Sequence, residues 1–187
     1  MKKILFLFLA ACFFFSCEKE TIVIPQQHAG RTVLAFFWAD NSLNSNLRNN
    51  IRTMMQGLQA MKDSAALLVY WDGEASDISW PEPCIVEYVT NGQGGINSLS
   101  KGTIDAMMAD KNTSIYDLIG IGNIRKKYPP QTSTEKTVMQ TVIGDMMSAY
   151  PSESYGIIFG SHGSGWLPTI TGTRSIGQDG GRYSSDT

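Results

Sequence analysis

Short, continuous apolar runs separated by segments of helical periodicity constrain the fold of this chain more than any other feature. The runs at 33–38, 65–71 and 155–159 combine β-branched, aromatic and aliphatic residues, which is typical of strands covered on both faces. A further β-like run lies at 84–89. Because helical segments stand between the runs, the order of elements predicts an α/β protein in which helices cover a parallel sheet.

Two segments between these runs repeat apolar residues every three or four positions, as in helices with one buried face. The first spans about 46–61. The second follows Thr-Ser-Thr-Glu at 132–135, which fits a capping box, and ends before Pro151. The stretch between them is less regular, with a short helix predicted at 104–109 and a strand or turn at 118–121. The apolar positions of the two clear helices are Leu47, Ile51, Met54, Met55 and Leu58, then Val138, Val142, Met146 and Tyr150.

The first residues have the composition of an export signal. Two lysines precede an apolar run at 4–15 that is too short to span a bilayer as a helix. Ser16 and Cys17 then stand directly before charged residues. This arrangement resembles a bacterial lipoprotein signal, in which the cysteine becomes the lipidated first residue, and it predicts an exported protein with a lipid anchor in the cell envelope, at the outer membrane or cell surface.

Lipidation at Cys17 divides the chain into a signal at 1–17, a polar tether at 18–31 and one domain of ordinary size at 32–187. Two alternatives stay open. Cys12 follows a more usual lipidation sequence, but cleavage there would leave three phenylalanines near the mature end. The segment can also be an ordinary secretory peptide with incidental cysteines.

Cysteine usage and charge exclude several classes of protein. Outside the signal Cys84 is the one cysteine, so the mature chain cannot form an internal disulfide, and we interpret Cys84 as a buried structural thiol. The net charge of −2 and the pI near 5.6 give no basic footprint for nucleic acid. No zinc-ligand or calcium-loop spacing is present in the sequence, so we assign no metal ligands.

A histidine stands where parallel sheets collect reactive groups. The run at 155–159 leads through a glycine-rich turn to His162, which is expected at the carboxyl end of a strand. Histidine accepts and releases protons near neutral pH. Gly163 follows, and a backbone without a Cβ can approach a substrate carbonyl closely and offer its N–H to a developing oxyanion.

The motif at 161–166, Ser-His-Gly-Ser-Gly-Trp after a strand, resembles the histidine motif of the clostripain family of cysteine peptidases, in the caspase-like clan. The segments 38–43 and 69–73 resemble that family in the expected order. The resemblance implies a caspase-like three-layer α/β/α sandwich with a mostly parallel sheet. It also implies an endopeptidase that cuts after Arg or Lys, with His162 in a Cys–His dyad and the Gly163 N–H binding the oxyanion.

In that family the nucleophile follows the next core strand in an Asp-x-Cys setting, and the sequence up to Thr187 contains no such cysteine. We therefore expect this chain to carry the histidine half only, with an incomplete sheet at its C-terminal side, and to be inactive alone. The remainder of the chain is expected downstream of Thr187. The expected partners are peptide or protein substrates and, through the lipid anchor, a membrane. The alternative is a non-catalytic exported lipoprotein that uses a peptidase-like scaffold as a binding module.

The resemblance suggests roles for three further residues. Asp40 is expected at the carboxyl edge of the sheet, within reach of a basic substrate side chain; the alternative is an N-capping or turn aspartate. Family members process themselves between histidine and cysteine, where Arg174 and Arg182 are the candidate cleavage points. We interpret Asp72 as a turn former. No cofactor is identified, and calcium dependence follows from the resemblance only.

Overall fold

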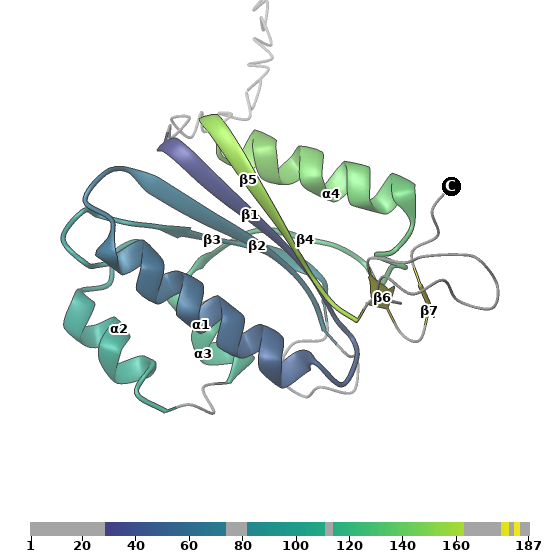
Figure 1. The fold of residues 1–187 in the computed structure, drawn as a ribbon, viewed down its shortest axis with the longest axis horizontal. Coiled ribbons are helices and arrows are strands. Elements are labelled where there is room, and N and C mark those ends of the chain that lie inside the picture. Colours follow the sequence, from purple (N-terminus) through teal and green to yellow (C-terminus); the bar gives the residue numbers. More distant parts are fainter. Residues whose placement is uncertain (1–28, 74–81, 111–113, 163–176, 180–181, 184–187) are drawn as a thin grey trace, which may run out of the picture.

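A twisted sheet with helices on both faces forms the centre of the molecule (Figure 1). The predicted signal with Cys17 and residues 18–28 of the predicted tether lie outside the part that can be described, whereas residues 29–31, also predicted as tether, belong to the first strand. The computed structural model describes residues 29–73, 82–110, 114–162, 177–179 and 182–183.

The five-stranded sheet has the order β4-β3-β2-β1-β5. Strand β1 pairs in parallel with β2 on one side and with β5 on the other, whereas β2–β3 and β3–β4 are antiparallel. The sheet is therefore mixed, and the expectation of a mostly parallel sheet holds for its β2-β1-β5 half. The strands are β1 (Ala29–Ala39), β2 (Ala65–Gly73), β3 (Cys84–Val89), β4 (Asn123–Lys127) and β5 (Ser152–Gly160).

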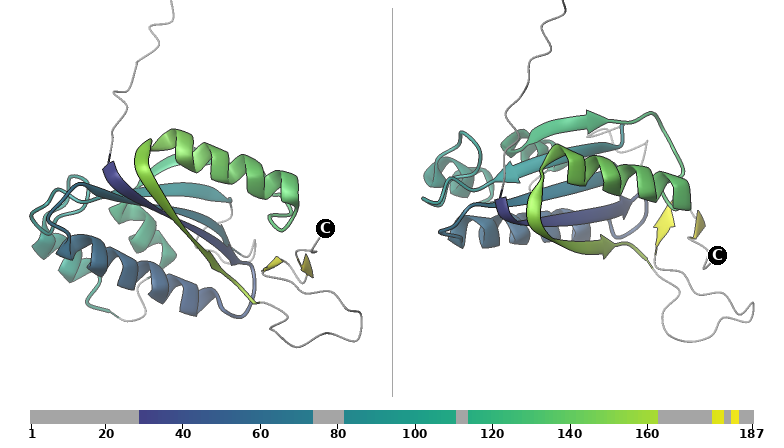
Figure 2. Two further views of the ribbon diagram at one scale, coloured as in Figure 1. Left: turned by 45° about the horizontal axis from the view of Figure 1, so that its top comes forward. Right: turned by 90° about the horizontal axis from the view of Figure 1, so that it is seen from above.

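Helices α1, α2 and α3 lie against one face of the sheet and α4 lies against the other, which confirms the three-layer sandwich (Figures 1 and 2). None of the described helices is both long enough and apolar enough to cross a membrane. The helices are α1 (Asn44–Ala60), α2 (Lys101–Met107), α3 (Ile115–Ile121) and α4 (Lys136–Ala149).

Alternating side chains of the central strands fill two separate cores. In β1, Ala35 and Phe37 pack toward α1, while Phe36 and Trp38 pack toward α4. Covering both faces removes the polar positions that a half-exposed strand would show, which explains the continuous apolar run in the sequence. The predicted helical faces are the ones that pack: Leu47, Ile51, Met55 and Leu58 of α1 and Val142 and Met146 of α4 are buried.

The region before α4 differs from its prediction. Residues 118–121, expected as a strand or turn, belong to helix α3. Its capping box pairs Ser114 with Asp117: the Ser114 hydroxyl accepts from the Asp117 N–H, and the Asp117 carboxylate accepts from the Ser114 N–H. The capping box predicted at 132–135 is wrong, because the N-cap of α4 is Glu135 and no side chain caps that helix.

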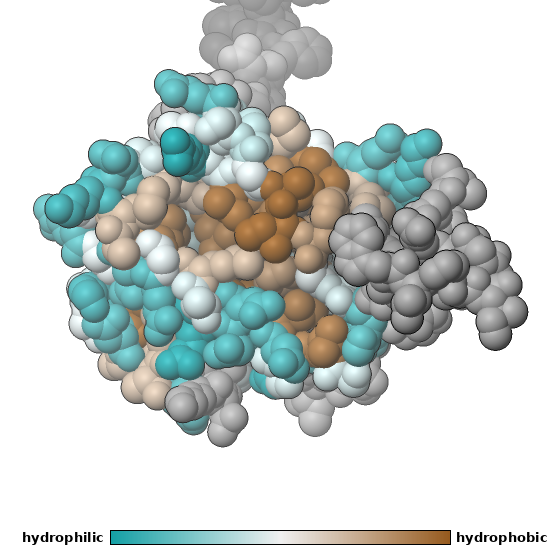
Figure 3. All heavy atoms as spheres, viewed as in Figure 1, coloured by the Kyte–Doolittle hydropathy of each residue, from teal (hydrophilic) through white to brown (hydrophobic). Residues whose placement is uncertain are grey.

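Strand β5 agrees with one expectation and differs from another: it lies at the open edge expected of an incomplete sheet, but it is not covered on both faces. Its apolar sequence predicted a strand covered on both faces, but among the described residues β5 pairs with β1 only and forms an edge of the sheet. Ile157, Ile158 and Phe159 are 45%, 42% and 38% exposed. Apolar side chains accordingly gather on the surface over this edge (Figure 3).

Candidate functional site

The carboxyl ends of β1, β2 and β5 meet at one edge of the sheet, because these three strands run parallel. Asp72 lies at the end of β2, level with Trp38 of β1 in the pairing register. At the other side of β1, Phe37 pairs with Gly160 of β5. Residues 40–43 after β1 and residues 161–162 after β5 therefore leave the sheet side by side.

His162 contacts the loop that follows β1. Its Nε2 lies 2.9 Å from the Ser42 hydroxyl oxygen, although the two residues are 120 positions apart in the sequence. Next to this contact, the Asn41 amide donates to the Ser161 hydroxyl at 3.3 Å. His162 is half-buried and Ser42 is exposed. The imidazole thus lies at the carboxyl edge of the sheet, partly open to solvent.

The loop between β1 and α1 is held by its own asparagines. The side-chain oxygen of Asn41 accepts from the Leu43 N–H at 2.9 Å, and the side-chain NH₂ of Asn41 donates to the Trp38 backbone carbonyl at 2.7 Å. The Asn44 amide donates to the Ala39 carbonyl at 3.1 Å. Short polar side chains that bond to neighbouring backbone in this way favour turns over continued strand. These bonds hold the loop that carries Ser42 at the carboxyl edge of the sheet.

Asp40 follows β1 directly and is half-buried at the same edge. The N-cap residue of α1 is Leu43 and no side chain caps that helix, so the N-capping alternative for Asp40 is wrong. That Asp40 binds a basic substrate side chain stays a prediction.

Asp72 is a buried carboxylate within β2, which corrects its interpretation as a turn former. It is 5% exposed and accepts a hydrogen bond from the Ser133 hydroxyl. That hydroxyl also lies 2.6 Å from the Tyr70 hydroxyl, which accepts from the Gln131 amide at 2.9 Å. The segment before α4 is thereby tied to the end of β2. No residue pattern in the sequence indicates this network, since Ser133 lies inside the segment 132–135 that resembles a capping box.

Gly160 lets β5 approach the core closely just before His162. A Cβ at this position would lie 2.6 Å from the Phe37 ring and 2.8 Å from a Leu47 methyl carbon. Gly177 approaches the Trp38 ring in the same way, with a Cβ position 2.8 Å from it. The chain therefore returns to this edge of the sheet after the residues that the structure leaves undescribed.

The described structure shows no contact between His162 and the remaining predicted site residues that it covers. Gly163 and Arg174 lie outside the described residues. Arg182 begins β7 (Arg182–Tyr183), which pairs with β6 (Gln178–Asp179). Cys84 is a buried side chain in β3, as interpreted from the sequence. Across the described part of the chain, no group of three His, Cys, Asp or Glu side chains is placed to hold a metal ion.

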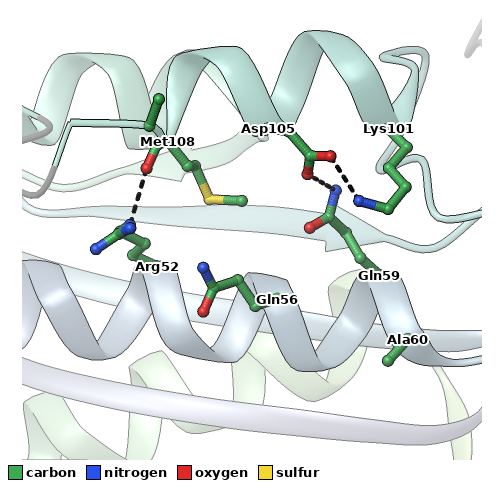
Figure 4. A pocket seen from close by; sticks show the side chains of 8 residues that line it. Arg52, Gln56, Gln59, Ala60, Lys101, Asp105 and Met108 are labelled. Carbon is green, nitrogen blue, oxygen red and sulfur yellow. Dashed lines mark hydrogen bonds and ion pairs between the residues drawn. The ribbon is translucent and has the colours of Figure 1, made fainter.

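A separate pocket of about 460 Å³ lies between α1 and α2 (Figure 4). Four of its polar side chains already have hydrogen-bond partners: Asp105 accepts from Lys101 at 2.5 Å and from Gln59 at 3.3 Å, and the Arg52 side chain donates to the Met108 carbonyl at 3.0 Å. None of the residues that line it belongs to the loops at the carboxyl edge. The edge that carries His162 is therefore the better candidate for chemistry.

Comparisons with known proteins show the family to which the chain is similar. A family model described as the clostripain family matches residues 35–185. Among solved structures, a B. fragilis cysteine protease is 27% identical, with a TM-score of 0.50, covering 75% of this chain and 95% of that one. No curated protein sequence matches this chain.

Two longer structures are also similar. One is a secreted C11 cysteine protease from Bacteroides thetaiotaomicron in complex with an irreversible peptide inhibitor, 25% identical with a TM-score of 0.51. The other is an inactive zymogen C11 protease from Parabacteroides distasonis, 25% identical with a TM-score of 0.52. The matches cover 84% and 80% of this chain but only 36% and 35% of those chains.

Proposed function

This chain belongs to the clostripain family of cysteine peptidases, and we propose that it is the histidine-bearing part of an endopeptidase whose Cys–His dyad cuts after Arg or Lys. The observation that carries the proposal is the position of His162. It is half-buried at the carboxyl edge of the sheet, directly after β5, and its Nε2 is bonded to the loop after β1. A base at this edge is accessible to a substrate and to a second reacting group.

The nucleophile in this proposal is a cysteine downstream of Thr187. The exposed apolar edge of β5 supports a continuation of the chain, because an unpaired apolar edge strand is normally covered. A further strand beside β5 would end at the same edge as His162. In this proposal the chain up to Thr187 is inactive alone, since its imidazole has no thiol to activate.

The reaction follows from the chemistry of a thiol beside an imidazole. His162 takes the thiol proton, and the sulfur attacks the carbonyl carbon to form an S–C bond. The imidazolium returns that proton to the amine nitrogen as the C–N bond breaks. Water then attacks the acyl-enzyme while its proton passes to the imidazole. The C–S bond breaks, and the proton passes to the sulfur, restoring the thiol.

The Gly163 N–H is proposed to bind the oxyanion of the tetrahedral intermediate, and Asp40 to bind the basic substrate side chain. Asp40 is supported by its place at the same edge as His162. Arg174 or Arg182 is proposed as the point of self-cleavage. One similar protein was solved as an inactive zymogen, which fits activation by processing.

Export is supported by a similar protein that is secreted. We further propose that Cys17 is lipidated and anchors the domain to the cell envelope. Mass spectrometry of the protein from its membrane fraction would test this: a diacylglycerol-modified Cys17 is expected, and cleavage elsewhere without lipid contradicts it.

The test of the peptidase proposal uses the full-length protein, read through the codons after Thr187. An Arg- or Lys-directed covalent peptide probe should label one downstream cysteine. His162→Ala and His162→Gln should abolish labelling, because the thiol loses its base. His28→Ala, in the predicted tether, is the matched control and should label normally.

Two outcomes contradict the proposal. A folded full-length protein with no labelled cysteine would favour the alternative of a non-catalytic binding module. Labelling that survives both substitutions of His162, with circular dichroism showing intact folds, would place the base elsewhere.

A further inference from the structure

We infer that Ser42 is a positioning residue for His162: its hydroxyl holds Nε2 of the imidazole and leaves Nδ1 to exchange protons with the cysteine sulfur. The inference rests on the proposed function and adds the residue that orients the base. It is carried by the Ser42–His162 contact and by the asparagine bonds that fix the loop in place.

The contact is specific to one ring nitrogen. The Ser42 oxygen lies 2.9 Å from Nε2, well within hydrogen-bonding distance. With the described residues, this is the one hydrogen bond that the His162 ring makes, so Nδ1 makes none with them. The serine hydroxyl likewise makes no other hydrogen bond with the described residues. Among the described residues, the Ser42 hydroxyl and the His162 ring are therefore each other's hydrogen-bond partner.

The position of Ser42 is set independently of His162. Asn41 bonds to backbone on both sides of itself, at Trp38 and Leu43. The same amide group donates to Ser161, the neighbour of His162. Two consecutive residues after β1 therefore hold two consecutive residues after β5. A loop fixed in this way can select one orientation of the imidazole.

The chemical consequence follows from the two nitrogens of a neutral imidazole, of which one donates and the other accepts. When the Ser42 oxygen accepts from the Nε2 proton, the bare nitrogen is Nδ1. Nδ1 can then accept the thiol proton and later give it to the leaving amine, while Nε2 keeps its proton throughout. Activated nucleophiles generally lie beside a base, and a third group orients that base.

The first experiment measures the tautomer of His162 directly. The chain is labelled with ¹⁵N-histidine, and its two histidines give separate ring signals, assigned with a His28→Gln variant. At alkaline pH the wild-type ring of His162 should be protonated at Nε2. Ser42→Ala should lower the ratio of the Nε2–H form to the Nδ1–H form by roughly three- to tenfold, the effect of losing one hydrogen bond.

Two variants serve as controls. Ser42→Thr keeps the hydroxyl, and because Ser42 is exposed the added methyl has room, so this variant should restore the wild-type ratio. Ser45→Ala removes an exposed hydroxyl from the first turn of α1 and should leave the ratio unchanged. An unchanged ratio in Ser42→Ala overturns the inference.

The second experiment measures turnover of a peptide substrate by the full-length enzyme. Ser42→Ala should lower kcat by about tenfold with little change in KM, because the substrate still binds while a smaller fraction of the rings faces the sulfur. Ser42→Thr should recover most of kcat. An unaltered kcat in Ser42→Ala overturns the role in catalysis even where the tautomer shifts.

The two experiments separate this inference from the function it rests on. An inactive and unlabelled wild-type protein would contradict the proposed Cys–His dyad. It would also contradict the proposal that Nδ1 exchanges protons with a cysteine sulfur. A tautomer shift measured in the same Ser42→Ala variant would still show that the serine holds the ring.

Discussion

At the scale of single residues, Gly160 shows how closely the strand before His162 packs. A Cβ at Gly160 would lie within 3 Å of the Phe37 ring and of a Leu47 methyl, whereas a Cβ at Gly156 in the same strand meets nothing within 4 Å. Both are glycines in an apolar run, so the sequence does not separate them. The strand end that presents His162 therefore depends on the absence of a side chain at one position.

Gly160→Ala should destabilise the fold by about 1–3 kcal/mol, because the new methyl group must displace packed side chains. Gly156→Ala is the matched control and should have little effect or stabilise slightly, since alanine loses less backbone entropy than glycine. Urea unfolding followed by circular dichroism measures both. Equal stability of the two variants would contradict the close approach.

The buried network around Asp72 is the second feature at this scale. Its carboxylate accepts from Ser133, whose hydroxyl also meets the Tyr70 hydroxyl. Ser133→Ala should therefore cost about 1–3 kcal/mol, because two buried polar groups lose a partner. Ser45→Ala, at an exposed position, should stay within about 0.5 kcal/mol of wild type. Thermal unfolding of both variants measures these changes. If Ser133→Ala left the free energy of unfolding unchanged, the network would be contradicted.

At the scale of elements, the segments at 114–117 and 132–135 both resemble capping boxes, and the structure uses only the first of these two as a cap. Ser114 and Asp117 exchange hydrogen bonds at the start of α3. The segment at 132–135 has the right residue types, but Ser133 within it turns inward to Asp72. The residue pattern alone does not distinguish these outcomes, because a cap and a buried contact compete for the same hydroxyl-bearing segment.

Ser114→Ala should cost about 1 kcal/mol, the usual loss when an N-cap hydroxyl is removed. Glu135→Ala should be nearly neutral, since no side chain caps α4. Chemical unfolding compares them under one set of conditions. A larger loss for Glu135→Ala than for Ser114→Ala would reverse the assignment of the caps.

Strand β4 was missed because its sequence, Asn-Ile-Arg-Lys-Lys, has the charge of a solvated loop. It is an edge strand beside β3, and most of its side chains are exposed. Charged residues on an edge strand hinder unwanted pairing. The opposite edge, β5, carries apolar residues instead. The two edges therefore differ in how readily they would pair with another chain.

At the scale of the whole molecule, the apolar edge of β5 should make this chain associate when it is prepared alone. Ile157, Ile158 and Phe159 are exposed on a strand with one partner among the described residues (Figure 3). Ile157→Lys should raise the monomer fraction in sedimentation velocity, because a charged edge resists pairing. Tyr116→Lys, at an exposed position of α3, is the matched control and should not. A monodisperse, cooperatively melting wild-type monomer would contradict the expectation.

The sequence by itself determined the α/β class, the core strands, the inner faces of α1 and α4, and the histidine motif that identifies the family. These are local properties: apolar periodicity reports burial, and a short motif reports the turn that presents His162. Hydrophobic runs long enough to be buried on both faces leave few alternative folds.

Tertiary structure decided the direction of β3 and β4, the edge position of β5 and the partners of His162 and Asp72. Periodicity records whether a residue is covered but not which element covers it or from which direction. Ser42 and His162 illustrate the reason, since they are 120 residues apart and meet only because β1 and β5 pair in parallel. Contacts of this kind depend on how the strands assemble, which no single segment encodes.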